Sequence, residues 1–203
     1  MKGRLGETGT GTATRFASAV IALGLVGLLV GCGKSASPAT SSPTGKSASA
    51  YVSAMCSSLV DWGQAFKTEA SNLASKVAAA PTLADKKQVF VDFTETLTTT
   101  TDTLIGRIQG LGVPAVDGGA DVESQLVAAF QRARQTLSSA HDKALALPTD
   151  DVNAFKKQVN EIGTSIGSLG DAFSGVGNMK NDALDTAFNA DPTCKQMTSL
   201  FSS

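Results

Sequence analysis

The chain contains 203 residues, with 17 Lys and Arg against 18 Asp and Glu and a formal net charge of −1. This balance excludes a strongly basic surface of the kind that binds nucleic acid or anionic membranes through charge alone. The length allows one ordinary domain with a continuous core.

The first 31 residues have the layout of an export signal. Lys2, Arg4 and Arg15 outnumber Glu7 and are followed by an apolar run over residues 16–30. The run is about 15 residues long, whereas a helix needs roughly 20 to cross a bilayer. We therefore expect residues 1–31 to be a signal peptide that is removed, and not a permanent membrane span.

The apolar run ends in Leu29-Val30-Gly31-Cys32, which resembles the lipobox of bacterial lipoproteins. The resemblance implies that the Cys32 thiol receives a diacylglyceryl group and that cleavage makes Cys32 the first mature residue. Two or three acyl chains would hold the protein stably on the outer, extracytoplasmic face of the cell membrane. The alternative is an ordinary secretory signal that happens to contain a cysteine.

A tether and a single domain are expected after the signal. Removing residues 1–31, with three basic residues and one acidic, leaves 14 basic against 17 acidic residues and a charge near −3. Residues 33–50 are almost entirely Ser, Ala, Thr, Pro and Gly, a composition too poor in large apolar groups to pack. We assign residues 32–50 to a lipidated cysteine with a flexible tether and residues 51–203 to the domain.

Two cysteines remain once Cys32 is assigned to the lipid. Cys56 and Cys194 would lie in a compartment that favours oxidation, so we expect a disulfide between them. The alternative is a pair of buried free thiols.

The first two helices are predicted from apolar residues at the three-and-four spacing of a helix with one buried face. One seam covers residues 52–77 and another covers residues 90–111. Thr82 is the expected N-cap of the second helix, with Asp85 as an acidic residue in its first turn.

The third and fourth helices are predicted over residues 122–147 and 152–176, with Asp121 as the candidate N-cap of the third. The fourth seam is the most regular. Its members are Val152, Phe155, Val159, Ile162, Ile166, Leu169, Phe173 and Val176.

An all-α fold follows, and its expected form is an up-down-up-down four-helix bundle. Short links force neighbouring helices to be antiparallel, and four helices of about 25 to 30 residues would each span roughly 40 Å. The start of the first helix and the end of the fourth would then meet at one end, near Cys56 and Cys194. Residues 178–203 are expected to form one or two short helices that cover this end.

No motif in the sequence specifies a reaction. Gly163-Thr164-Ser165-Ile166-Gly167 matches the G-x-S-x-G pattern of serine hydrolases, but it lies inside a helix seam without a preceding strand, and His141 precedes it. We expect Gly163, Gly167 and Gly170 to let a neighbouring helix approach closely or to loosen their own helix. No catalytic residue, cofactor or metal site is therefore expected.

Four other features have structural interpretations. The mature part has only four glutamates and no Glu-x-x-His pair, which argues against a di-iron site. His141 is expected to be solvated or satisfied by hydrogen bonds, and Trp62 to pack in the core. The threonines over residues 98–103 are expected to form a solvated helix face.

The lipobox, the tether, the alanine-rich helices, the Gly112-Val113-Pro114 hinge and a cysteine near each end of the domain resemble small secreted lipoproteins of actinobacteria. That resemblance implies a location and a helical fold, without catalytic residues. We expect a non-enzymatic envelope module that binds a partner protein or a cell-wall polymer. The alternative is a carrier that holds a small apolar ligand, such as a lipid, between its helices.

Overall fold

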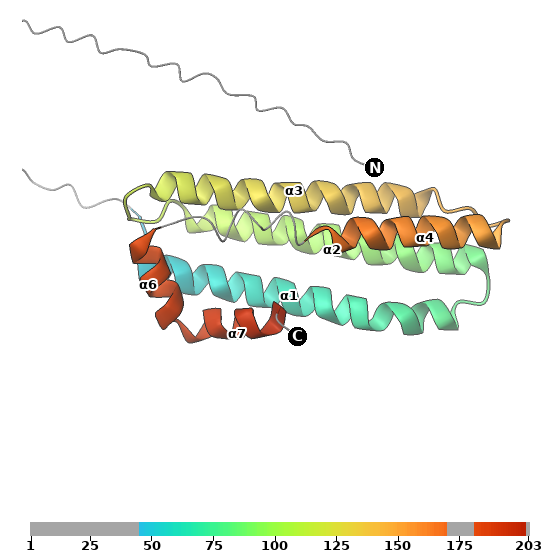
Figure 1. Ribbon diagram of the computed structural model, residues 1–203, viewed down its shortest axis with the longest axis horizontal. Helices are drawn as coiled ribbons and strands as arrows, with labels where there is room; N and C mark the ends of the chain where they lie inside the picture. The colour runs from blue at the N-terminus through green and yellow to red at the C-terminus, as the bar shows by residue number, and fades with distance from the viewer. Residues whose placement is uncertain (1–44, 170–180, 202–203) are drawn as a thin grey trace, which may run out of the picture. The chain divides into compact units, whose positions relative to one another are not determined.

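The computed structural model describes residues 45–169 and 181–201, which belong to one compact unit, Ser41–Ser203 (Figure 1). The described residues are mainly helical and contain no strand, so the all-α prediction is confirmed. Their helices are α1 (Ala48–Ala79), α2 (Leu83–Leu111), α3 (Gly119–Leu145), α4 (Val152–Gly167), α6 (Asp182–Ala190) and α7 (Pro192–Phe201). Cys32, the expected signal peptide and most of the expected tether lie outside the described residues. The described end of that segment differs from the expected flexible tether through residue 50, because α1 already begins at Ala48 and Lys46 pairs with Pro114.

The start of α2 has the expected cap. The Thr82 hydroxyl accepts a hydrogen bond from the Asp85 backbone N–H at 3.1 Å, and an Asp85 carboxylate oxygen accepts one from the Thr82 N–H at 3.2 Å. Each side chain thus satisfies a backbone donor that the helix itself leaves unpaired. The prediction for Thr82 is confirmed.

The start of α3 differs from the prediction. The N-cap position is Gly118, with a φ of 70°, and Asp121 lies in the first turn of the helix. A glycine is required directly afterwards, because a Cβ on Gly119 would clash with the carbonyl oxygen of Pro114. The tight α2–α3 loop therefore sets this helix boundary, and a sequence pattern of cap residues does not reveal it.

The fourth helix is shorter than predicted. Asp151 caps α4 by accepting hydrogen bonds from the N–H groups of Asn153 and Ala154, and α4 ends at Gly167. Ser168 forms a turn, whereas the sequence pattern predicts one helix through Val176, which lies outside the described residues. Glycine has low helix propensity, so Gly167 weakens the helix where the apolar spacing alone predicts continuation.

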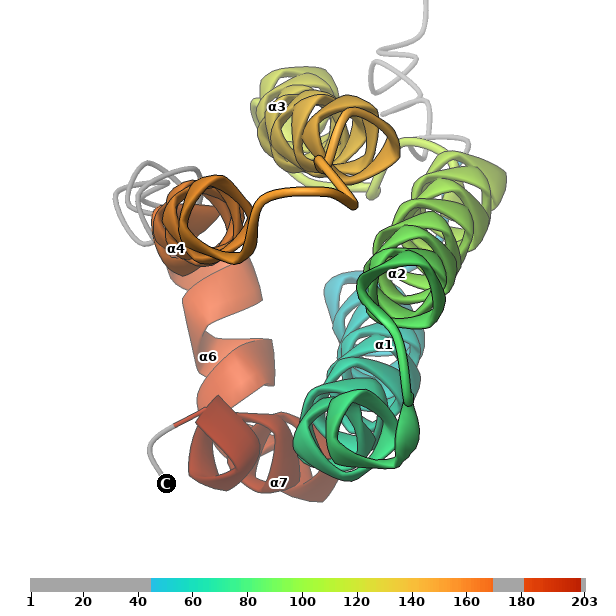
Figure 2. The same cartoon turned by 90° about the vertical axis from the view of Figure 1, so that its right-hand side faces the viewer.

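Packing between the helices follows the order of the chain. α2 packs against both α1 and α3, and α3 packs against α4, whereas α1 and α4 are not among the closely packed pairs of described helices. Figures 1 and 2 show the four helices lying lengthwise beside one another, with α6 and α7 near one end. The short helices α6 and α7 both pack against α1.

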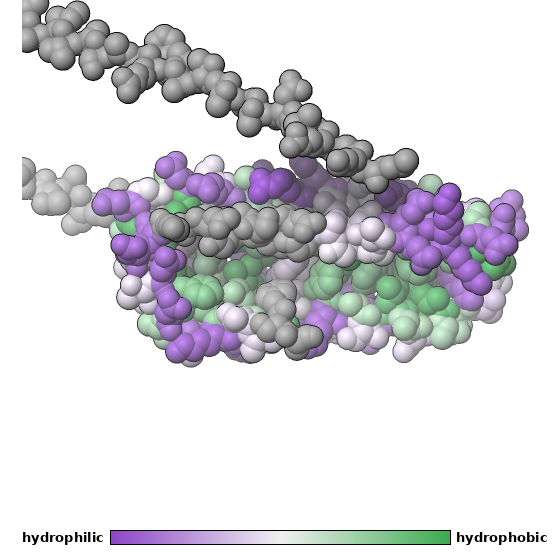
Figure 3. All heavy atoms as spheres, in the orientation of Figure 1, coloured by the Kyte–Doolittle hydropathy of each residue, from purple (hydrophilic) through white to green (hydrophobic). Residues whose placement is uncertain are grey.

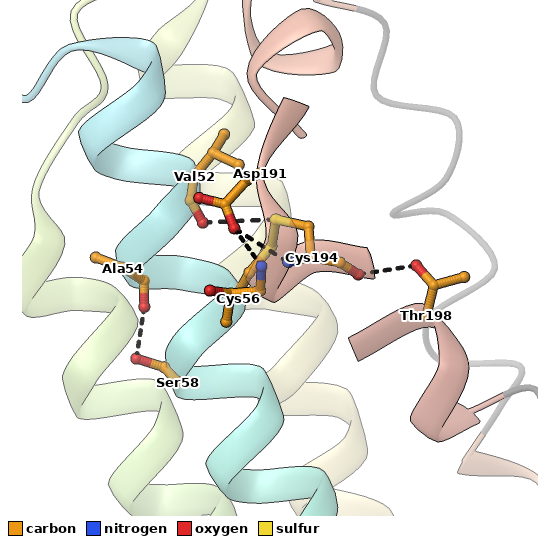
Figure 4. Close-up of a disulfide and its surroundings, with 8 residues drawn as sticks. Val52, Ala54, Cys56, Ser58, Asp191, Cys194 and Thr198 are labelled. Carbon is orange, nitrogen blue, oxygen red and sulfur yellow. Dashed lines mark hydrogen bonds between the residues drawn. A yellow bond between two sulfur atoms is a disulfide. The ribbon is translucent and has the colours of Figure 1, made fainter. Parts of the chain in front are cut away.

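A disulfide joins α1 to α7. Cys56 and Cys194 are fully buried and bonded to each other, with their Cα atoms 5.0 Å apart (Figure 4). Leu184 of α6 and Met197 of α7 pack into the same apolar cluster. The predicted disulfide and the predicted short helices after residue 178 are confirmed, and the alternative of free thiols is wrong.

Candidate functional site

The burial of α1 changes abruptly along its length. Every fully buried residue of this helix lies between Tyr51 and Gly63. Farther along, Phe66, Leu73 and Val77 are only half-buried, although all three are large apolar residues on the inward seam. The second half of α1 therefore has a partner on the α2 side and lacks a comparable cover elsewhere among the described helices.

α4 has a similar apolar row. Phe155 and Ile162 are buried, whereas Val159 and Ile166 are half-buried and pack against the same cluster as Leu73. Because α4 packs on α3 and not closely on α1, the apolar rows of α1 and α4 border a seam that no other described helix covers. Figure 3 shows hydrophobic side chains gathered in a hollow between these two helices.

We call this feature the α1–α4 groove and define its walls as Phe66, Leu73, Val77, Val159 and Ile166. Its floor consists of buried core residues that are all apolar. These are Phe90, Phe93, Leu97, Ala133, Leu137, Ala140, Ala144, Phe155 and Ile162. The ring centroids of Phe90 and Phe155 are 6.2 Å apart, which links α2 to α4 below the groove. The residues that define the walls and floor are thus hydrophobic, whereas the fully buried Thr94 of α2, between Phe90 and Leu97, is polar and has its hydroxyl hydrogen-bonded to the Phe90 carbonyl and to His141.

Small residues border the groove on both sides. A Cβ placed on Gly163 or Gly167 would meet no atom within 4 Å. The prediction that these two glycines bring a neighbouring helix close is therefore wrong, and Gly170 lies outside the described residues. Ala70 and Ala74 are exposed on α1. The residues at the solvent-facing edges of the groove therefore have small side chains, and these leave the apolar rows accessible to a ligand.

Three lysines lie near the end of the groove that is farthest from the disulfide. Lys86 and Lys87 are half-buried in the first turns of α2, and Lys156 is exposed in the first turns of α4. Lys87 lies between Leu83 and Phe90 at helical spacing, and both of these belong to the apolar cluster. Among the described residues none of the three lysines forms an ion pair.

The G-x-S-x-G segment does not form a hydrolase site. Ser165 lies in the body of α4, where its hydroxyl donates to the Glu161 carbonyl at 2.9 Å and accepts from Lys143 Nζ at 3.0 Å. His141 is instead hydrogen-bonded to Thr94, with 3.1 Å between Nδ1 and Oγ1. Ser165 thus has neither a histidine base nor the exposed turn that a nucleophile elbow needs. The expectation that hydrogen bonds satisfy His141 is confirmed.

Metal ligation finds no support within residues 45–169 and 181–201. No group of three or more His, Cys, Asp or Glu side chains in this part of the chain is arranged to hold an ion.

Trp62 belongs to the core, as predicted, and lies beside the inner end of the groove. It is 8% exposed, and its ring centroid is 5.8 Å from that of Phe66 and 6.0 Å from that of Phe130. Its Nε1 donates to the Thr101 hydroxyl at 3.0 Å. A ligand that contacts Phe66 should therefore change the fluorescence emission of the Trp62 indole.

The threonine run is solvated only in part. Thr99 and Thr103 are exposed, but Thr101 is fully buried, so the prediction of a wholly solvated face is wrong at this position. Thr94 and Thr101 are one heptad apart on the seam of Leu97. This heptad spacing could have predicted that both threonines are buried. Both hydroxyls donate hydrogen bonds to backbone carbonyls of their own helix.

Two titratable groups near the disulfide have shifted pKa values. Burial, together with the nearby Glu123 charge, raises the pKa of Tyr51 to about 12, and the buried phenol oxygen has no hydrogen-bond partner among the described residues. Desolvation opposes ionisation of Asp191, but hydrogen bonds from the Ser53 side chain and the N–H groups of Cys194 and Thr193 lower the pKa of this carboxyl. Asp191 thereby caps the start of α7.

The chain was compared with protein families, curated proteins and solved structures. No family model, no curated protein and no solved structure matches the chain. Within the described ranges, no helix is both long and apolar enough to cross a membrane. The geometry of the α1–α4 groove is thus the main guide to function.

Proposed function

We propose that the chain is an envelope lipoprotein with a signal peptide over residues 1–31, a lipid anchor on Cys32 and a tether that ends before Lys46, where the chain already contacts the domain. The domain over residues 51–203 would be a non-enzymatic binding module on the outer face of the cell membrane. The sequence Leu29-Val30-Gly31-Cys32 supports the anchor. The order of signal, polar tether and helical domain supports the location.

The position where the tether joins the domain supports an orientation. Lys46 pairs with Pro114 in an isolated bridge, and the Ala115 N–H donates to the Lys46 carbonyl at 2.8 Å. This contact fixes the start of α1 beside the α2–α3 loop, at the disulfide end. We infer that the domain hangs from this end, so that the lysine end of the α1–α4 groove points away from the membrane.

For the arrangement of α1 to α4 we infer an up-down-up-down bundle whose seam between the first and last helix is open. The short links around Pro81 and Pro148 support antiparallel neighbours. The apolar walls of the open seam suit an apolar ligand, and each buried CH₂ of such a ligand contributes about 0.8 kcal/mol. We therefore propose that the module binds an apolar ligand in the α1–α4 groove. The half-buried apolar rows on both walls carry this proposal.

The test uses the compact unit Ser41–Ser203 produced by an exporting host. Native and denatured masses are compared, and the neutral dye Nile red is titrated into the delipidated protein. We expect the native protein to carry an additional ligand mass that is lost on denaturation, or the delipidated protein to bind the dye in a way that Val159→Gln abolishes. Leu145→Gln is the matched control, because Leu145 is 49% exposed and lies outside the groove. A bare mass with no dye binding, or dye binding that both variants leave intact, would refute the proposal.

A second candidate is docking of an amphipathic helix from a partner protein. α7 already packs against α1, where Cys56 and Val60 are buried, and the same stripe continues at helical spacing to Ala70 and Ala74. A partner helix could extend this arrangement along the uncovered half. Crosslinking from a photoreactive residue at position 74 in the intact envelope should then capture one protein, and a crosslink to lipid alone would exclude this candidate.

A further inference from the structure

We propose that the ligand of the α1–α4 groove is a long-chain fatty acid, held with its carboxylate among Lys86, Lys87 and Lys156. This inference rests on the proposed function and specifies its ligand. Two observations support it. An apolar row runs along each wall of the groove, and three lysines lie near one end of it.

The apolar rows suit a single extended chain. Along α4 the lining runs from Phe155 to Ile166, which at 1.5 Å per residue is about 16 Å. One row from α1 faces it, with Val77 near the lysine end and Phe66 near the inner end. Because the side chains that define the walls and floor are all hydrophobic, an acyl chain packed against them would leave water without stranding a polar group of those side chains.

The lysines suit an anionic head group. Lys87 lies on the inward seam of α2, so its stem runs over apolar surface while its ammonium group must find solvent or a counter-charge. Lys156 lies on the groove side of α4, four residues after Val152 and three before Val159. A carboxylate at this end would accept charge-assisted hydrogen bonds from these ammonium groups.

Two of the neighbouring carboxylates, Asp85 and Asp151, are already engaged. Asp85 accepts from the Thr82 N–H and hydroxyl, and Asp151 accepts from two N–H groups at the start of α4. Both side chains are therefore held at helix N-termini, where they stabilise the positive end of the helix dipole. The three lysines keep their donors available for a ligand.

Trp62 gives a direct readout, because it is the single tryptophan of the chain and its ring lies 5.8 Å from that of Phe66. Oleate and oleyl alcohol are titrated, below the concentrations at which they aggregate, into the delipidated unit Ser41–Ser203 while indole emission is followed. We expect saturable binding of both compounds, with oleate bound more tightly. Lys156→Ala and Lys87→Ala should each weaken oleate by about fivefold and leave oleyl alcohol unchanged.

Lys157→Ala is the matched control, since Lys157 is also exposed on α4 and helix periodicity places it on the side opposite the row of Phe155 and Val159. It should alter neither affinity. Equal affinities for oleate and oleyl alcohol, or equal effects of the Lys156 and Lys157 substitutions, would overturn the fatty-acid inference while the apolar groove remains. If neither compound binds, the proposal that the α1–α4 groove binds an apolar ligand is itself refuted. Far-ultraviolet circular dichroism verifies that each variant is folded.

Discussion

Breaking the Cys56–Cys194 disulfide should remove a large part of the stability of the domain. The two cysteines are 138 residues apart, and the chain-entropy model then gives about 5 kcal/mol of destabilisation. Domains of this size are usually stable by only about 5 to 15 kcal/mol. We therefore expect the Cys56→Ala/Cys194→Ala variant to be marginally folded.

The assay is urea denaturation of the unit Ser41–Ser203, followed by Trp62 emission, for the oxidised protein, the reduced protein and the double variant. Reduced protein and double variant should agree, because both lose the same constraint on the unfolded chain. Added reductant should leave the double variant unchanged, which controls for side effects of the reagent. A loss below about 1 kcal/mol would show that the entropic reasoning does not apply to this loop.

Three further predictions concern single side chains. Thr101→Val removes the acceptor of the buried indole N–H and should cost about 1 to 3 kcal/mol in urea denaturation, whereas the exposed Thr103→Val should change stability by less than about 0.5 kcal/mol. Gly119→Ala should destabilise because of its contact with a backbone carbonyl, whereas Gly163→Ala should stabilise by about 0.5 to 1 kcal/mol, and the opposite order would refute the geometry. The raised pKa of Tyr51, about 12, means that folding disfavours the phenolate, so the contribution of Tyr51 to stability is constant below pH 10 and falls by about 1.4 kcal/mol per pH unit from there up to the folded pKa. Absorbance titration of this single tyrosine checks the value, and ionisation near pH 10 in the folded protein would contradict it.

Much of the helical architecture was predictable because it depends on local signals. Apolar spacing predicted α1, α2 and α3, and the Thr82 cap was evident from residue types alone. The disulfide followed from elimination, once Cys32 was set aside. These inferences need only the periodicity of a helix, the chemistry of its first turn and the redox character of a compartment.

The candidate site was not predictable in this way. Val60 and Val77 are both valines on the inward side of α1, yet Val60 is buried and Val77 is half-buried. The sequence pattern treats them alike, and it also continues α4 beyond Gly167. Whether an apolar side chain is covered depends on which helix lies opposite. That helix can be about a hundred residues away in the sequence, and for the second half of α1 the described helices supply no close partner opposite α2. The α1–α4 groove exists because α4 packs on α3 and not closely on α1, a result of long-range packing that no local spacing encodes.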